Sequence, residues 1–162
     1  MQLLLLRHGK AEASHSAGDF SRALVERGRQ QARNAAHFLR AAGQLPQLVL
    51  TSPLIRARQT ADEFCQAAAI PPATVHGWLA CGMTPPTAIR ELAACQQFNS
   101  IALVGHEPDL STLTEWLLGT THGSIEVKKG TIVALQINPN TRYGVLSFLI
   151  PPALIDRPLT AR

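Results

Sequence analysis

Short apolar runs alternate with longer amphipathic stretches over most of the chain. Runs of four to eight apolar residues suit strands that are buried in a sheet. The strands predicted in this way are Gln2–Leu6, Gln47–Leu50, Ser100–Val104, Thr131–Ile137, Val145–Ile150 and, more weakly, Ala73–His76. Helices are therefore expected in the stretches between these runs.

The clearest helix is predicted over Leu24–Ala41. Small and apolar residues recur there at spacings of three and four, which places them on one stripe of a helix. The residues of this stripe are Leu24, Gly28, Ala32, Ala35, Ala36 and Leu39. Gly43 is expected to end the helix as a C-cap.

Prolines mark the starts of three further helices. Ser52-Pro53 is typical of an N-cap followed by proline at the first helical position, and predicts a helix that reaches about Ala68. Thr84-Pro85 repeats the signal for a shorter helix that reaches about Cys95. A fourth helix is expected after Pro108.

The order of these elements predicts the fold class. Strands and helices alternate over the first two-thirds of the chain, which implies a three-layer α/β/α sandwich with a mostly parallel, mixed central sheet. The last two strands, joined by Asn138-Pro139-Asn140, are expected to form an antiparallel hairpin at the margin of the sheet. With 162 residues, the whole range 1–162 is expected to be a single domain.

Composition and charge exclude several classes of protein. With 46% hydrophobic and 16% charged residues, the chain is neither disordered nor a repeat protein, and Leu3–Leu6 is too short to cross a membrane or to serve as a signal peptide. The three cysteines are an odd number without CxxC spacing, so we expect no disulfides and a cytoplasmic location. The net charge of +4 is scattered and aromatics are few, which argues against nucleic acid as a partner.

Chemically capable residues follow three of the predicted strands. Arg7-His8-Gly9 ends the first, Ser52 and then Arg56 follow the second, and Gly105-His106-Glu107-Pro108 follows the strand at 100–104. In open α/β sheets ligands bind at the carboxyl ends of the strands. Two arginines and two histidines near two helix N-termini would converge there, and they suit a phosphate dianion.

These residues stand in four ordered motifs that resemble the histidine phosphatase superfamily, also called the phosphoglycerate mutase-like family. The first motif is Arg7-His8-Gly9 after a strand. The second is Leu-x-x-x-Gly-x-x-Gln-Ala, which begins here at Leu24. The third is Ser-Pro-x-x-Arg-Ala-x-Gln-Thr, which begins at Ser52, and the fourth is Gly105-His106 before a helix. The resemblance covers most of the chain and implies the phosphoglycerate mutase-like fold.

The short chain and the stretch from Asp19 to Leu24 resemble the SixA-type phosphohistidine phosphatases within that superfamily. Those proteins carry Asp-x-x-Arg-Pro-Leu-Thr there, whereas this chain has Ala23 in place of the proline and Val25 in place of the threonine. The resemblance implies that His8 attacks phosphorus, while Arg7, Arg56 and His106 hold the phosphoryl oxygens. We expect His8 to be neutral, with its pKa lowered by the arginines, and His106 to be protonated.

One expected group is missing. Family members that cleave phosphate esters usually carry a carboxylate shortly after the third strand, but the stretch 76–82 contains no Asp or Glu. The absence of this acid should slow the hydrolysis of an alkyl phosphate ester more than that of a phosphoramidate. An N-phosphorylated imidazole can take a proton from solvent on its other ring nitrogen. Glu107 or Asp109 could substitute as the acid.

Four further residues are candidates for substrate contacts, namely Gly9, Arg22, Ser52 and Glu107. Arg22 is equally well interpreted as an exposed loop arginine without a substrate contact. Ser52 is better interpreted as a helix cap than as a substrate contact. Glu107 is better interpreted as a favourable negative charge at the helix N-terminus. The remaining histidines carry no motif. No metal or other cofactor is expected, because adjacent arginines repel a dication.

The sequence thus predicts a monomeric, metal-independent phosphatase that removes the phosphoryl group from phosphohistidine on a protein, such as a histidine phosphotransfer domain. Two alternatives stay open. One is a phosphatase or mutase acting on small-molecule phosphate esters, and the other is a phosphate-binding protein without turnover. Neither a nucleic acid nor a membrane is expected as a partner.

Overall fold

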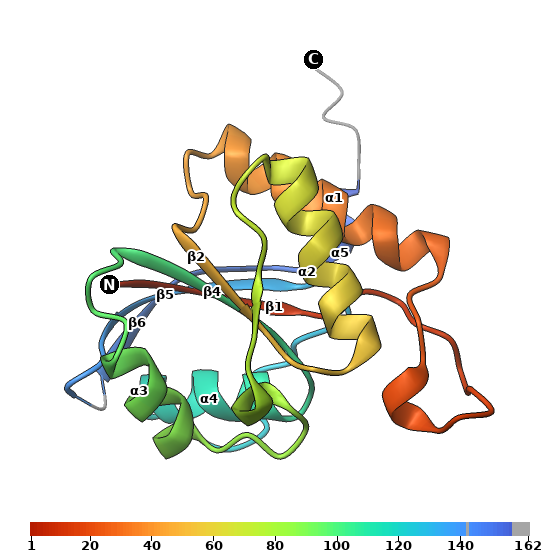
Figure 1. Ribbon diagram of the computed structural model, residues 1–162. Helices are drawn as coiled ribbons and strands as arrows, with labels where there is room; N and C mark the ends of the chain where they lie inside the picture. The colour runs from red at the N-terminus through yellow and green to blue at the C-terminus, as the bar shows by residue number, and fades with distance from the viewer. Residues whose placement is uncertain (142, 157–162) are drawn as a thin grey trace.

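A computed structural model describes residues 1–141 and 143–156 of the chain (Figure 1). The strands of these residues form one sheet, and most are followed by a helix. The strands are β1 (Gln2–Arg7), β2 (Leu48–Thr51), β3 (Thr74–Val75), β4 (Ser100–Gly105), β5 (Ile132–Asn138) and β6 (Tyr143–Ile150). The helices are α1 (Glu26–Ala41), α2 (Ile55–Ala68), α3 (Pro85–Ala93), α4 (Asp109–Leu118) and α5 (Pro152–Ile155), with short 3₁₀ helices η1 (Asp19–Ser21) and η2 (Gly77–Leu79).

The sheet is mixed and mostly parallel, as predicted. Its strand order is β3-β2-β4-β1-β5-β6. The first four strands in that order run parallel to one another, whereas β5 pairs antiparallel with both β1 and β6. The predicted hairpin is therefore confirmed, with β6 at the margin.

Helices cover both faces of the sheet, which confirms the three-layer sandwich. In Figure 1, α1 and α2 lie on one side of the sheet and α3 and α4 on the other. Successive side chains of a strand point to opposite faces. Leu3 and Leu5 of β1 accordingly pack in the core beneath α3 and α4, and Leu4 and Leu6 pack in the core beneath α1 and α2.

Two predicted helix starts were wrong by two residues. The first helix begins at Glu26, because Leu24 pairs with Ala11 in an isolated antiparallel bridge. The second begins at Ile55 rather than at Pro53, and its N-cap is Leu54. Ser52 instead prolongs the line of β2, since its N–H donates to the Val104 carbonyl oxygen at 3.0 Å.

The other helix boundaries agree more closely with the sequence pattern. Thr84 is the N-cap of α3 as predicted, and its side chain accepts a hydrogen bond from the N–H of Thr87. That helix ends at Ala93, two residues before the predicted Cys95. Gly43 follows the C-cap Ala42 with a φ of 65°, a left-handed conformation that glycine adopts without steric cost.

The topology brings three loops to one edge of the sheet. Because β1 and β2 both pair parallel with β4, the register places Arg7 beside Gly105 and Thr51 beside Val104. The residues that follow these strands are the ones that the sequence selected for chemistry. Carboxyl ends of parallel strands are where open α/β sheets bind ligands.

Candidate active site

His8 follows β1 directly and is only 5% exposed. Its backbone N–H donates to the Gly105 carbonyl oxygen at 3.1 Å, which ties it to the end of β4. The ring nitrogen Nδ1 lies 2.8 Å from the Gly9 carbonyl oxygen. A carbonyl oxygen can only accept, so the proton of the neutral ring belongs on Nδ1. The lone pair is then on Nε2, the nitrogen available for attack.

Two glycines let the loop after His8 approach α1. A Cβ atom on Gly9 would lie 2.5 Å from the Gly28 carbonyl oxygen, and one on Gly28 would lie 2.1 Å from the Lys10 carbonyl oxygen. Either contact is too short for a side chain. Gly9, proposed from the sequence as a substrate contact, is thus also required by the close packing of its loop against the first turns of α1.

Three polar side chains from the helices hold the same loop region. Thr60 accepts a hydrogen bond from the Gly9 N–H at 3.1 Å, and Gln31 accepts one from the Lys10 N–H at 2.9 Å. Gln59 accepts one from the Leu24 N–H at 2.7 Å. Sequence reasoning gave these three residues no role of their own. Their positions in the second and third motifs could have indicated a role in the site. The structure shows that they hydrogen-bond to the loop around His8.

Arg56 lies in the first turn of α2 and is 3% exposed. Its Nε is 3.3 Å from the Nε2 of His8. Its two other nitrogens donate to the backbone oxygen of Asp19 at 2.8 Å and to the carboxylate Oδ2 of Asp19 at 3.0 Å. The guanidinium group is therefore fixed against the attacking nitrogen, where it would meet the oxygens of a phosphoryl group.

His106 follows β4 and is 2% exposed. Its ring centre lies 5.3 Å from that of His8, and its Nε2 lies 2.7 Å from the hydroxyl oxygen of Ser52. Ser52, which the sequence assigned as a helix cap, is fully buried and lies before the N-cap Leu54. Its hydroxyl accepts a hydrogen bond from the Leu54 N–H at 3.3 Å in addition to contacting this histidine. Two loops that are far apart in the sequence thus fix the second histidine beside the first.

Unmet hydrogen-bonding capacity gathers around His8. Arg7 donates from Nη1 to the Val127 carbonyl oxygen at 2.8 Å, but its buried Nε has no partner within residues 1–141 and 143–156. The same holds for the buried Nδ1 of His106. Buried polar atoms are rarely left without a partner, because the lost hydration costs about 1–3 kcal/mol. Oxygens of a bound phosphate would meet this demand.

Burial keeps both histidines neutral in the unliganded protein. It lowers the pKa of His8 to about 3, with smaller contributions from the charges of His106, Arg56 and Arg7. The neutral nucleophile agrees with the sequence prediction, although burial and not the arginines is the main cause. Burial, followed by Arg56, also lowers the pKa of His106 to about 4. The protonated His106 predicted from the sequence concerns the phosphate-bound site, where a dianion would raise its pKa.

The two carboxylates considered as substitute acids have partners in α4 and in the loop before α3. Glu107 Oε1 accepts a hydrogen bond from the Ser111 N–H at 3.2 Å, and burial raises the pKa of Glu107. Asp109 Oδ2 accepts from the N–H groups of Gly82 and Met83 at 2.9 and 3.1 Å. Asp109 thus fastens a neighbouring loop, and burial raises its pKa although the two N–H groups act to lower it.

Arg22 is linked to the site through Asp19, a residue to which the sequence assigned no role. Its Nη2 lies 2.8 Å from Oδ1 of Asp19, and its Nη1 donates to the Glu12 carbonyl oxygen at 2.8 Å. Asp19 therefore bridges Arg22 and Arg56. The spacing of Asp19 and Arg22 was visible in the SixA-like stretch, but nothing in the sequence linked it to Arg56.

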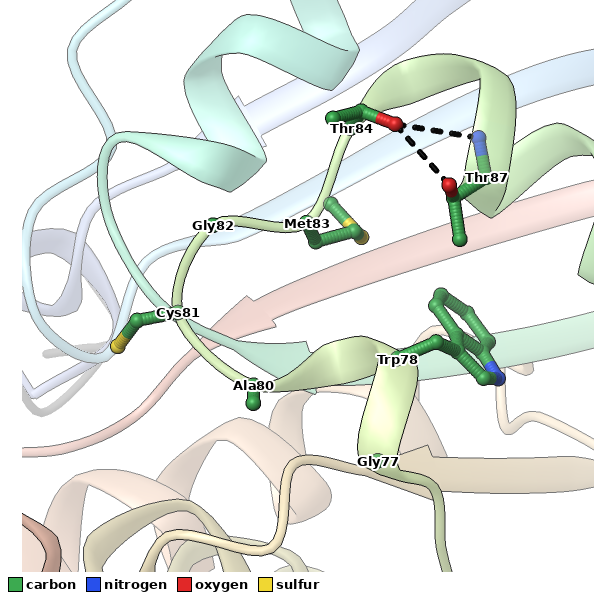
Figure 2. A pocket seen from close by; sticks show the side chains of 8 residues that line it. All are labelled: Gly77, Trp78, Ala80, Cys81, Gly82, Met83, Thr84 and Thr87. Carbon is green, nitrogen blue, oxygen red and sulfur yellow. Dashed lines mark hydrogen bonds between the residues drawn. The ribbon is translucent and has the colours of Figure 1, made fainter.

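The stretch 76–82, where a carboxylate was expected, runs past the other side of Arg56. Cys81 Sγ lies 3.9 Å from Nη2 of Arg56. Figure 2 shows Cys81 and Trp78 extending to opposite sides of this loop, with Trp78 toward Thr87 of α3. The loop and the start of α3 line a cavity of about 270 Å³. A thiol therefore occupies the place beside Arg56, and burial raises its pKa above the ordinary value.

Within the described part of the chain, no group of three or more His, Cys, Asp or Glu side chains is placed to hold a metal ion. Among the helices described, none combines the length and the apolar character that crossing a membrane requires.

Comparison with known proteins bears on the whole arrangement. A family model described as the histidine phosphatase superfamily, branch 1, matches residues 3–79, the part that carries Arg7, His8 and Arg56. The chain belongs to the histidine phosphatase superfamily. His106 lies beyond the matched residues, and its place in the site comes from the fold.

Relatives extend the similarity to nearly the full length. An uncharacterized protein of Picosynechococcus sp. is 33% identical over 144 residues, which cover 84% of this chain and 85% of that protein. The structure of the protein histidine phosphatase SixA complexed with tungstate has a TM-score of 0.87 and 24% identity, covering 96% of this chain and 99% of the other.

A second structural neighbour is described by a different kind of substrate. A protein described as a putative alpha-ribazole-5'-P phosphatase from Escherichia coli has a TM-score of 0.74 and 23% identity, covering 94% of this chain and 97% of the other. These likenesses show the phosphoglycerate mutase-like fold. Family and neighbours together indicate a phosphatase, without deciding between a protein substrate and a small molecule.

Proposed function

We propose that the protein is a metal-independent phosphohistidine phosphatase that acts on a phosphorylated histidine of another protein, such as a histidine phosphotransfer domain. The range 1–162 would be one catalytic domain, acting as a monomer in the cytoplasm. One observation carries the proposal: a neutral, buried His8 faces Arg56, and the carboxylate that contacts Arg56, Asp19, is ion-paired with two arginines. The site thus offers a nucleophile and cations, and the carboxylate bound to those cations is held in its ionised form by Arg56 and Arg22.

The reaction would proceed in two displacements at phosphorus. In the first, the Nε2 lone pair of His8 forms a bond to phosphorus while the bond to the substrate nitrogen breaks and its electron pair returns to the leaving imidazole. Arg7, Arg56 and His106 would bind the phosphoryl oxygens, where charge spreads in the transition state. In the second, water attacks phosphorus, and inorganic phosphate and free His8 result.

The leaving group explains why a missing acid favours phosphohistidine. An alkoxide must receive a proton on the bridging oxygen itself, and general acid catalysis of this kind is worth about 10²–10⁴-fold. A phosphorylated imidazole can instead be protonated on its remote nitrogen before the bond breaks, since free histidine has a pKa of about 6.5. The ring then leaves as neutral imidazole without any acid at the bridging atom.

The small-molecule alternative rests on Glu107. Burial raises the pKa of this carboxyl group, which would favour the protonated form that an ester requires. The fold is also shared with the Escherichia coli alpha-ribazole-5'-P phosphatase. The carboxyl oxygen Oε1 is, however, occupied by the Ser111 N–H, so phosphohistidine is the better supported substrate.

The test is a comparison of kcat/KM for a peptide containing phosphohistidine and for a phosphoserine peptide of the same sequence, both in EDTA. We expect the phosphohistidine peptide to be favoured at least about 100-fold, the lower bound for an absent general acid. Glu107→Gln should leave the ratio unchanged. Comparable turnover of the ester, with loss of ester activity in Glu107→Gln, would establish the alternative. Activity lost in EDTA and restored by a metal ion would contradict the metal-free mechanism.

A further inference from the structure

Asp19 lies at the site but takes no part in the two displacements described above. It begins η1, in the loop that projects beyond the carboxyl end of β1 (Figure 1, red-orange). Its carboxylate binds Arg56 at 3.0 Å and Arg22 at 2.8 Å, and Arg56 in turn lies 3.3 Å from His8. The side chain is nevertheless 63% exposed. An anionic group thus stands at the open side of a cationic, buried site.

The surroundings of Asp19 keep it ionised. The groups that face it are Arg56 of α2, Arg22 after η1, Cys81 after η2 and His106 after β4. Slight burial acts to raise the pKa of Asp19, but the hydrogen bonds and charges of Arg56 and Arg22 outweigh it and hold the pKa below the ordinary value. Each carboxylate oxygen can accept about two hydrogen bonds. Oδ1 already meets Nε and Nη2 of Arg22, each at 2.8 Å, whereas Oδ2 meets only Nη2 of Arg56 at 3.0 Å, so one further donor can be bound at Oδ2.

An ionised carboxylate cannot protonate a leaving alkoxide, but it can bind the ring of phosphohistidine. When that ring is protonated on its remote nitrogen it carries a positive charge and presents an N–H donor. A neighbouring carboxylate stabilises this charged form, and at about 4–6 Å the effect on a pKa is about 1–3 units. The protonated ring is also the form that departs as neutral imidazole.

We propose that Asp19 is a specificity-determining residue, whose carboxylate accepts a hydrogen bond from the remote ring N–H of a phosphohistidine substrate and stabilises the protonated ring. This inference rests on the proposed function and names the group that recognises the leaving imidazole. As the bond from phosphorus to nitrogen breaks, the electron pair stays with the leaving ring, the remote proton stays on that ring, and the phosphoryl group passes to Nε2 of His8. No proton needs to be supplied at the bridging nitrogen.

A purely structural role for Asp19 predicts different behaviour. Arg56 is held by the backbone oxygen of Asp19 at 2.8 Å as well as by its carboxylate, and a side-chain change leaves that contact in place. Asp19→Asn also keeps an oxygen that can accept from Arg56. If the carboxylate served only to orient the arginines, its loss would affect all phosphate substrates alike. If it also binds the leaving ring, the loss is larger for phosphohistidine, and only the pH profile of that substrate moves.

The experiment compares wild type, Asp19→Asn and Asp19→Glu on a phosphohistidine peptide and on p-nitrophenyl phosphate across pH. The aryl ester is the control substrate, because its leaving group needs little protonation. We expect Asp19→Asn to lower kcat/KM for phosphohistidine about tenfold on the alkaline side and to move the alkaline limb down by about one pH unit; the loss for the aryl ester should be smaller, and its alkaline limb should not move. Asp19→Glu should restore part of the loss. Asp62→Asn, at an exposed position of α2, is the charge-matched control.

The outcomes separate this inference from the proposed function. Equal losses on both substrates with an unmoved alkaline limb, or no loss on either, would overturn the role of Asp19 while leaving the wild-type preference for phosphohistidine intact. A wild-type enzyme that does not prefer phosphohistidine over the phosphoserine peptide would overturn the proposed function itself.

Discussion

His8→Ala is expected to abolish hydrolysis of phosphohistidine and of phosphate esters, with kcat falling at least about 10⁴-fold, as for the removal of other enzymatic nucleophiles. The physical reason is the position of the lone pair. Nδ1 is engaged with the Gly9 carbonyl oxygen, which leaves Nε2 unprotonated against Arg56. The His106 ring does not stand in the same place, because its centre lies 5.3 Å from that of His8. Steady-state phosphate release measures the effect.

The matched control is His37→Ala, which removes an exposed histidine from α1. Its activity should equal that of wild type. Circular dichroism of the His8→Ala variant, and its retained binding of tungstate, would show that the fold and the cationic groups survive. Turnover by His8→Ala near the wild-type rate would eliminate His8 as the nucleophile and, with it, the covalent mechanism.

Arg56→Ala is expected to lower kcat/KM about 10³-fold or more, the scale found when an arginine that stabilises a transferring phosphoryl group is removed. The guanidinium group is 3% exposed and contacts His8 directly, so its charge acts at short range in a site largely shielded from water. Affinity for inorganic phosphate or tungstate should fall in parallel, which isothermal titration calorimetry can measure.

Two variants separate the charge of Arg56 from its geometry. Arg56→Lys keeps a cation but loses the fork that bridges His8 and Asp19, and should recover only a small part of the activity. Arg58→Ala removes an exposed arginine two residues further along α2 and should change nothing. If anion affinity of a folded Arg56→Ala protein equalled that of wild type, Arg56 would have no place in the phosphate site.

The central sheet and four of the site residues could be predicted because each rests on a local signal. Apolar runs marked the strands, and Arg7, His8, Arg56 and His106 follow strands whose parallel order brings their carboxyl ends together. The structure places these residues beside one another. The sequence placed Gly28, in the second motif, on the packing stripe of a helix. Only the structure shows that the lack of a side chain at Gly28 lets the loop after His8 pack closely against α1.

What the sequence could not predict depends on contacts between distant segments. Asp19 meets Arg56 across 37 positions, and Ser52 meets His106 across 54 positions. Ser52-Pro53 matched a helix start so well that its tertiary contact was missed; pairing with β4 outweighed the local preference and moved the helix start to Ile55. The neutral state of His106 likewise depends on burial, which residue identity does not reveal.

The most direct test of the account is to observe the phosphoryl group on His8 itself. The enzyme, in excess and in EDTA, is mixed with a phosphohistidine peptide, quenched in alkali, digested and examined by mass spectrometry. We predict one transient phosphoryl group on His8, which forms as the peptide loses its own and decays as inorganic phosphate appears. Phosphate release at the full rate with His8 never phosphorylated, or with another residue phosphorylated in its place, would contradict the account.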